Sequence, residues 1–254
     1  MRLYNSPVNL IILTPSDAAG VDTFEISDER SAHIRNVLRS QVGDTLRVGI
    51  VDGPVGTATI VGISEISVRL EFANQEPMPL PTHETDVICA LPRPQTLKKV
   101  LSLAATMQVR NLFLIRADRV EKSYYHSPLL QPDNYRRFLI EGLGQGKSTR
   151  LPVVTIHDRF RRFLEDELPT LAEKEESCRR LLPDPDSDRR LTDILPPSGT
   201  NSLIAIGPEG GWVPFEIEAM ESIGFQCFCL GPWTLRVEQA LTAALAQIEL
   251  AQKR

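Results

Sequence analysis

From residue 86 onward, short apolar runs alternate with longer amphipathic segments, and this alternation limits the fold more than any other feature of the sequence. Strands are expected at 87–91, 111–117, 153–156, 179–182, 202–207 and 226–231. Helices are expected at 95–107, 134–145, 157–168 and 237–253, with a further helix that starts near Pro214. Strands that alternate with helices build a mostly parallel sheet that is covered on both faces. We therefore predict an α/β domain over residues 86–254.

Residues 1–76 follow a different pattern, in which β-branched runs are separated by turn residues. These runs lie at 45–50, 56–63 and 67–72. One helix is expected among them at 27–38, with Ser27 as its cap and an apolar face of Ile34, Val37 and Leu38. Short strands without a strand–helix–strand rhythm favour a small β-barrel. The proline-rich residues 77–85 would form the linker between the two domains.

The distribution of charge, more than its sum, bears on the partner. The 254-residue chain has a formal net charge of −5, which by itself argues against nucleic acid. Residues 93–150, however, contain 11 Lys or Arg against 4 Asp or Glu. Five further basic side chains cluster within the acidic first segment: Arg30, His33, Arg35, Arg39 and Arg47. This segregation indicates a basic face that binds nucleic acid, and the alternative is a solvated helical surface.

Several classes of protein are excluded by the sequence. No apolar run approaches the length of a membrane span, so we expect a cytoplasmic protein with no membrane partner. The cysteines lack the spacing of a metal site, so we expect reduced thiols and no metal; they are Cys89, Cys178, Cys227 and Cys229.

Two strand ends carry the residues that point to chemistry. The strand at 202–207 continues into Pro208-Glu209-Gly210-Gly211, whose small residues let a ligand approach the backbone. The strand at 226–231 is followed by Pro232, and then by Arg236 and Glu238 just before the last helix. Ligands bind beyond the carboxyl ends of parallel strands, so both loops are expected to form adjacent walls of one pocket. Neither loop has the glycine spacing of a dinucleotide-binding loop or a P-loop, which disfavours a nucleotide-dependent oxidoreductase.

Each motif also has a simpler interpretation. The first would be a plain strand–helix turn. Arg236 would form a surface ion pair, and Glu238 would only complement the positive end of the helix dipole.

Together the motifs resemble a known family. Ile206-Gly-Pro-Glu-Gly-Gly and Leu230-Gly-Pro-x-x-Leu-Arg-x-Glu, followed by an alanine-rich helix, are similar to the ribosomal RNA methyltransferases that modify N3 of uridine in 16S rRNA. His33-Ile-Arg-Asn-Val-Leu-Arg and Val42-Gly-Asp resemble the PUA-like barrel of that family. The resemblance covers nearly the whole chain in order. It implies a trefoil-knotted SPOUT methyltransferase domain at 86–254 behind a PUA-like β-barrel at 1–76.

The resemblance also implies a cofactor, S-adenosylmethionine, and a partner, ribosomal RNA or the small ribosomal subunit. The cofactor would be bound by Ile206, Gly207, Pro208, Gly210, Gly211, Leu230, Gly231, Pro232 and Leu235. Arg236 would stabilise the developing uracil anion, while Glu209 or Glu238 would position Arg236 or accept a proton through water. The residues expected to contact RNA are Arg35, Arg39, Arg93, Lys98, Lys99, Arg119, Lys122 and Gln145.

A homodimer is expected as well, because relatives of this fold are dimeric and the last helix is apolar over more than one face. The chain departs from the family pattern at 106–108, which read Thr-Met-Gln, at Ser148 and at Trp233. These departures leave two alternatives open: a methyltransferase of the same fold that modifies another RNA position, or a catalytically silent RNA-binding relative.

Overall fold

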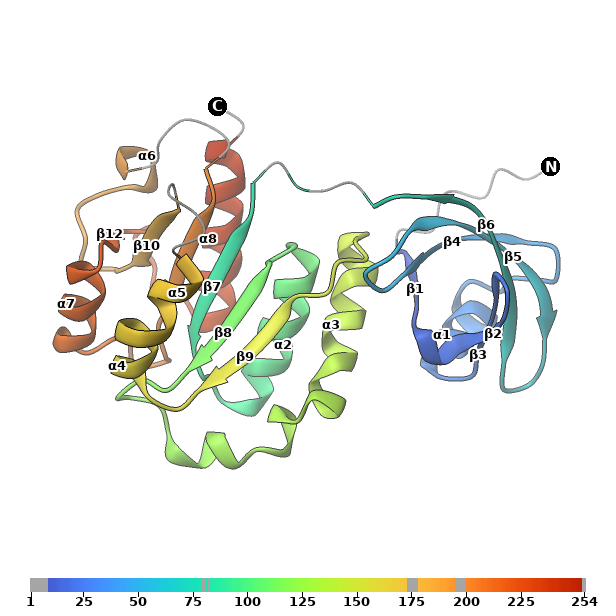
Figure 1. Cartoon of the computed structure of the whole chain (residues 1–254), viewed down its shortest axis with the longest axis horizontal. Coiled ribbons are helices and arrows are strands. Elements are labelled where there is room, and N and C mark those ends of the chain that lie inside the picture. The colour runs from blue at the N-terminus through green and yellow to red at the C-terminus, as the bar shows by residue number, and fades with distance from the viewer. Residues whose placement is uncertain (1–8, 79–80, 82, 173–177, 195–199, 253–254) are drawn as a thin grey trace. The chain divides into compact units, whose positions relative to one another are not determined.

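The computed structural model describes residues 9–78, 81, 83–172, 178–194 and 200–252, which form two compact units (Figure 1). The first unit consists of residues 1–80 together with 140–151, and the second of residues 81–139 and 152–254. The helix α3 (Pro132–Gly146) therefore begins in the second unit and ends in the first.

The first unit is a curled six-stranded sheet around an apolar core. Its strands are β1 (Ile11–Leu13), β2 (Ala18–Gly20), β3 (Thr23–Ile26), β4 (Thr45–Ile50), β5 (Val55–Ile63) and β6 (Val68–Glu76), in the spatial order β1-β4-β5-β6-β3-β2. All pairs are antiparallel except β1 with β4. Leu13, Ile26, Ile60 and Leu70 are fully buried between them. The three predicted β-branched runs are confirmed as β4, β5 and β6.

The helix expected at 27–38 is shorter and less regular than predicted. It consists of α1 (Glu29–Ala32) and a π-helical turn, η2 (His33–Val37). Asp28 caps it instead of Ser27, since the Asp28 carboxylate accepts a hydrogen bond from the backbone N–H of Arg30 at 2.9 Å. A π turn is wider than an α turn, which shifts the side chains that follow. Ile34 is fully buried, whereas Val37 is 66% exposed, so the predicted apolar face is wrong at Val37.

The end of α3 and the residues after it pack on this sheet. The backbone N–H of Leu10 donates to the Gly144 carbonyl at 2.9 Å, and that of Asp52 donates to the Thr149 carbonyl at 2.7 Å. The Thr149 hydroxyl donates to the Gly53 carbonyl at 2.7 Å. These bonds explain why residues 140–151 belong to the first unit.

The second unit contains an all-parallel six-stranded sheet, which confirms the predicted α/β pattern. Its strands are β7 (Thr85–Ala90), β8 (Asn111–Ile115), β9 (Val153–His157), β10 (Arg179–Pro183), β11 (Ser202–Ile206) and β12 (Gln226–Phe228), in the order β12-β10-β11-β7-β8-β9. The central strands β7 and β11 are buried at every position, as expected for a sheet covered on both faces.

Helices cover both faces of this sheet (Figure 1). They are α2 (Pro94–Thr106), α4 (Phe160–Arg162), α5 (Leu168–Ala172), α6 (Leu191–Ile194), α7 (Pro214–Ser222) and α8 (Val237–Gln252). Shorter turns are η1 (Pro15–Asp17), η3 (Lys122–His126), η4 (Pro128–Leu130) and the π turn η5 (Phe163–Glu167). The helix predicted at 157–168 instead starts at Phe160 and continues through η5 to Ala172, because His157 is still part of β9. The predicted last residue of α8, Lys253, lies outside the described residues.

Among the described helices, none combines the length and the apolar character that a membrane crossing requires.

Candidate functional site

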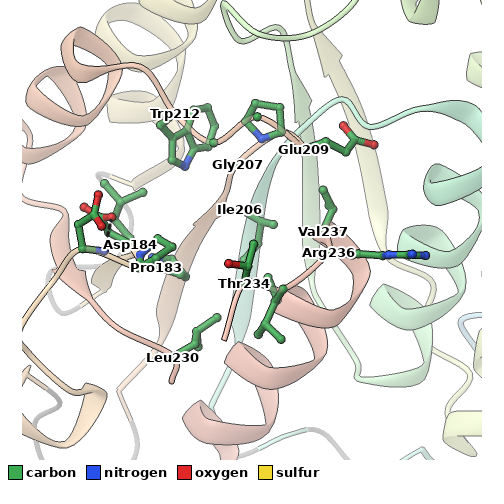
Figure 2. A pocket seen from close by; sticks show the side chains of 18 of the residues that line it. Pro183, Asp184, Ile206, Gly207, Glu209, Trp212, Leu230, Thr234, Arg236 and Val237 are labelled. Atoms are coloured by element: carbon green, nitrogen blue, oxygen red, sulfur yellow. Dashed lines mark hydrogen bonds between the residues drawn. The ribbon is translucent and has the colours of Figure 1, made fainter. Parts of the chain in front are cut away.

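The strand order of the second unit brings three loops together at one edge of the sheet. β10 lies between β12 and β11 and is parallel to both, so the carboxyl ends of all three strands point the same way. The loops that follow them line a cavity of about 510 Å³ (Figure 2). Two of these loops are the glycine–proline motifs that were expected to share a pocket, and residues from both line this one cavity.

The first wall follows β11 and is held by hydrogen bonds to a buried carboxylate. The side chain of Glu216, on the first turn of α7, is fully buried. It accepts hydrogen bonds from the backbone N–H groups of Val213 at 3.0 Å and of Asp118 at 2.7 Å. A buried carboxylate with two such donors is satisfied, and it ties the loop to the end of β8. The wall is therefore held in place before any ligand arrives.

Close packing explains two of the glycines in this wall. A Cβ atom on Gly207 would lie 3.2 Å from the Trp212 indole nitrogen, and one on Gly210 would lie 3.1 Å from Cδ of Arg119. The Arg119 guanidinium also donates a hydrogen bond to the Gly210 carbonyl. Gly211 has φ +71°, a conformation that L side chains rarely adopt. The loop is thus compact only because its residues are small.

The second wall follows β12 and leads into α8. The side-chain amide of Gln247 donates to the Leu230 carbonyl at 2.9 Å, which anchors the start of this loop. Arg236, at its end, lines the cavity and is exposed. Its backbone N–H donates to the Gln239 side chain at 3.0 Å. Its guanidinium makes no hydrogen bond or ion pair with the residues that the structure describes.

The two candidate carboxylates near Arg236 have other partners. Glu238 forms an ion pair of 2.9 Å with Lys99 of α2. The Lys99 ammonium, which donates a hydrogen bond to it, lowers the pKa of the Glu238 carboxyl, so this group is a poor proton acceptor. Glu209 accepts a hydrogen bond from the backbone N–H of Arg93 at 3.3 Å. Within the described part of the chain, Arg236 is therefore a cation at the cavity that forms no ion pair.

The third wall is one that the sequence analysis did not identify. It consists of residues 182–186, the end of β10 and the start of the loop after it, with Asp184 facing the cavity from the side opposite Arg236 and Glu209 (Figure 2). The backbone N–H of Asp184 donates to the Phe228 carbonyl at 2.9 Å, and its carboxylate accepts from the N–H of Asp186 at 3.0 Å. The signal was present, since a predicted strand at 179–182 runs directly into Pro-Asp-Pro-Asp.

The cavity gathers most of the predicted site residues. Its lining includes the expected cofactor residues Ile206, Gly207, Pro208, Gly210, Gly211, Leu230, Gly231 and Leu235, and the expected catalytic residues Glu209 and Arg236. Pro232 and Glu238 are not among the lining residues. Trp212, which was not predicted, lines the cavity with its indole N–H buried and without an acceptor among the described residues.

The residues expected to contact RNA occupy varied positions. Arg119 lines the cavity, and Lys99 is paired with Glu238. The Lys98 ammonium lies 5.7 Å from the centre of the Phe138 ring. Arg93, the N-cap residue of α2, donates through Nε to the Thr96 hydroxyl at 3.2 Å, and Lys122 is exposed in η3.

In the first unit, Arg39 and Gln145 are exposed, whereas Arg35 donates to the carbonyls of Ser31, at 3.2 Å, and of Glu65. Arg39 and Gln145, two of the three residues predicted to contact RNA in this unit, are thus available at its surface.

The buried Cys89 thiol, on β7, is not available as a nucleophile. Burial raises the pKa of the Cys89 thiol to about 12, so it remains protonated and unreactive. Within the described ranges, no group of three or more His, Cys, Asp or Glu side chains is arranged to hold a metal ion. The cavity offers close backbone approach, apolar side chains, carboxylates on two sides and a guanidinium that has no ion pair among the residues described.

Comparisons with known proteins find relatives along nearly the whole chain. A protein with the name ribosomal RNA small subunit methyltransferase E from Treponema pallidum is 27% identical over 249 residues, which cover 95% of this chain and 90% of the relative. The protein of the same name from Bacillus subtilis is 26% identical, and the match covers 94% of each chain.

Solved structures show the same fold. A ribosomal RNA small subunit methyltransferase E from Neisseria gonorrhoeae, bound to S-adenosylmethionine, matches 95% of this chain and 97% of its own with a TM-score of 0.73 and 20% identity. A methyltransferase from Legionella pneumophila, also in complex with that cofactor, matches 95% of this chain and 98% of its own with a TM-score of 0.74 and 21% identity. These likenesses show a fold shared over nearly the whole chain, in agreement with the predicted parallel α/β domain that follows a small β domain in the sequence.

Models of protein families give the assignment directly. An RNA methyltransferase PUA domain matches residues 26–73, within the first unit. An RNA methyltransferase domain matches residues 78–249, which include the whole parallel sheet and all three walls of the cavity. This chain therefore belongs to the RNA methyltransferase family.

Proposed function

We propose that this chain transfers a methyl group from S-adenosylmethionine to N3 of a uridine in 16S ribosomal RNA. The observation that carries the proposal is the cavity at three parallel strand ends, with its glycine-lined walls and an unpaired arginine. The names of the relatives point to small-subunit ribosomal RNA, and two solved structures of the same fold contain the cofactor.

The residues of the cavity fit this cofactor in size and chemistry. A volume of about 510 Å³ lies in the range typical of small-molecule sites, roughly 300–1,000 Å³. Ile206, Leu230 and Val237 offer apolar surface to an adenine ring. The Asp184 carboxylate would attract the positive end of the cofactor, and the Trp212 indole N–H lacks an acceptor among the described residues. When bound, the cofactor supplies an electrophilic methyl group on a positively charged sulfur.

In this proposal, Arg236 supplies the charge that the reaction needs. N3 of uridine carries a weakly acidic proton, which must leave as the new N–C bond forms. As this proton leaves, negative charge develops on N3 and on the two carbonyl oxygens of the uracil, and transfer of the methyl group then removes that charge. The Arg236 guanidinium, exposed at the cavity and without an ion pair among the described residues, would stabilise that charge. Because it is already in position, little reorganisation is required in the transition state.

The proposed roles of the two glutamates differ because their partners differ. Glu209 lines the cavity and would accept the N3 proton through a water molecule. Glu238 is held by Lys99 and would act as a positioning residue, since it fixes the start of α8 two residues after Arg236. The proposed RNA contacts remain the basic side chains named from the sequence, with Arg119 nearest to the chemistry because it lines the cavity.

The test is methyl transfer from labelled cofactor to small-subunit RNA, naked or assembled, taken from a strain without this gene. Mass spectrometry then maps the modified nucleotide. We expect one N3-methyluridine. Methylation at another position would favour the first alternative. Cofactor binding by calorimetry and RNA binding without methyl transfer would favour a catalytically silent relative.

A further inference from the structure

Trp233 is the most exposed tryptophan of the chain and lies beside the reactive part of the cavity. Of the two tryptophans, Trp212 is 8% exposed and Trp233 is 65% exposed. Both line the same cavity. A large aromatic side chain that is left in solvent at the edge of a binding site is a common feature of surfaces that bind a partner.

The Trp233 ring rests on the backbone of the loop. A Cβ atom on Gly231 would lie 2.3 Å from Cζ3 of Trp233 and 2.5 Å from Cε3, closer than any real Cβ contact. The ring is therefore seated against Gly231, which has no side chain to displace it. With that side covered by backbone and most of the residue exposed, the ring is held in place and still presents aromatic surface to a ligand.

The neighbours of Trp233 indicate what kind of ligand this surface fits. Arg236 follows three residues later, lines the same cavity and has no anionic partner among the described residues. The inner part of the cavity, at Ile206 and Val237, is buried and apolar. An exposed aromatic ring beside a free guanidinium suits a planar ring that carries partial negative charge on its oxygens, which describes a pyrimidine base.

We propose that Trp233 is the platform on which the target uracil stacks when it leaves the RNA. This inference rests on the proposed function and adds a positioning residue to it. An enzyme that modifies a base atom must first take that base out of the RNA stack, which costs a few kcal/mol. Stacking on an aromatic ring recovers part of that cost. The platform would hold the uracil plane with its oxygens towards Arg236.

Substitution of Trp233 separates stacking from simple packing. Removal of one base–aromatic stack costs about 1–3 kcal/mol, or roughly 5- to 150-fold in affinity. Trp233→Ala should therefore raise the apparent Kd for substrate RNA about 5- to 150-fold. Trp233→Phe should retain most of the affinity, whereas Trp233→Leu, which still covers Gly231 but has no aromatic face, should resemble alanine. Cofactor affinity, measured by calorimetry, should stay within about twofold in all three variants. For comparison, a tenfold loss of affinity would correspond to about 1.4 kcal/mol.

Fluorescence gives a readout that does not depend on turnover. Acrylamide should quench the emission of exposed Trp233 and leave buried Trp212 nearly unaffected. Binding of the RNA that the wild-type protein methylates should protect Trp233 from quenching, whereas S-adenosylmethionine alone should not. In Trp233→Phe the protection should vanish, because only Trp212 remains.

The outcomes distinguish this inference from the proposed function. If wild-type protein methylates no RNA, the proposed function fails. If it methylates RNA while Trp233→Leu equals Trp233→Phe in RNA affinity, the platform is wrong. A parallel loss of cofactor affinity in the alanine and leucine variants would assign the ring to the cofactor, and a change in oligomeric state would assign it to a second copy of the chain. Either result overturns the proposal.

Discussion

Removal of the Arg236 side chain should abolish most methyl transfer and leave the protein folded with its cofactor bound. The structure gives the reason for this separation. The guanidinium is exposed and makes no hydrogen bond or ion pair with the described residues, so Arg236→Ala removes no such bond from that part of the structure. Surface substitutions of this kind usually change the free energy of unfolding by less than about 0.5 kcal/mol. Cofactor affinity should likewise change by no more than a few-fold.

The expected loss of rate is much larger than the loss of stability. One preorganised group that stabilises an anionic transition state typically contributes about 10²–10³ in turnover, or roughly 3–4 kcal/mol. Its contribution arises as charge develops, so kcat should fall more than RNA or cofactor binding. Arg236→Lys should recover little, because an ammonium cannot reproduce the planar, forked donor of a guanidinium.

Single-turnover methylation at saturating cofactor is the decisive measurement, with thermal unfolding recorded in parallel. Arg159→Ala is a matched control, since Arg159 is also exposed but does not line the cavity. Its rate should equal that of the wild type. If Arg236→Ala retains a near wild-type rate, or if its thermal stability and cofactor affinity fall together while the rate persists, the charge-stabilisation argument is refuted and Arg236 only supports the loop.

Three further predictions concern ligands and assembly. Gly210→Val should weaken S-adenosylmethionine binding more than about tenfold by calorimetry, since the new side chain starts 3.1 Å from Arg119 Cδ and must occupy or distort the cavity wall. Charge reversal at Lys98 or Lys122 should weaken RNA binding and reduce the slope of log K against log salt by about one; an unchanged slope would mean a merely solvated surface. If the chain forms a homodimer, sedimentation at micromolar concentration should detect a dimer. Leu250→Glu should shift that dimer towards monomer, because Leu250 lies on α8 and is 63% exposed. An active wild-type monomer would rule the dimer out.

The sequence predicted most accurately the strands and helices whose structure depends mainly on their own residues. The strands β7, β8 and β11 and the helix α2 follow from apolar runs and periodicity, and each lies within a few residues of its predicted range. The two glycine–proline loops were recognisable because a parallel strand places its carboxyl end at the ligand edge. Most of the predicted cofactor residues consequently line one cavity.

Prediction failed where the local pattern admits two geometries. Both irregular helices contain a π turn, at His33–Val37 and at Phe163–Glu167, and a wider turn changes which side chains face the core. Periodicity at the α-helical repeat placed Val37 inside, whereas it is exposed. Similarly, the cap at Asp28 competes with Ser27 one residue earlier, and either residue type can cap a helix.

The third wall of the cavity was missed because strand order is not a local property. Nothing in residues 179–186 indicates that β10 lies between β11 and β12, which are its neighbours in space but follow it in sequence. Once that order is known, the position of Asp184 follows directly, because it is the first residue after the strand. The sequence Pro-Asp-Pro-Asp, which alone indicates a polar surface turn, is then understood as a charged side of the cavity.

The availability of Arg236 depends on the same kind of long-range contact. From the sequence, a surface ion pair between Arg236 and a nearby glutamate was as reasonable as a catalytic role. In the fold, α2 and α8 bring Lys99 within 2.9 Å of Glu238, and the N-terminus of α2 brings the Arg93 N–H to Glu209. Each of the two candidate carboxylates, Glu209 and Glu238, thus has a partner contributed by a segment more than one hundred residues away. Contacts made by α2 and its N-cap residue therefore engage both candidate carboxylates, and among the described residues the Arg236 guanidinium forms no ion pair.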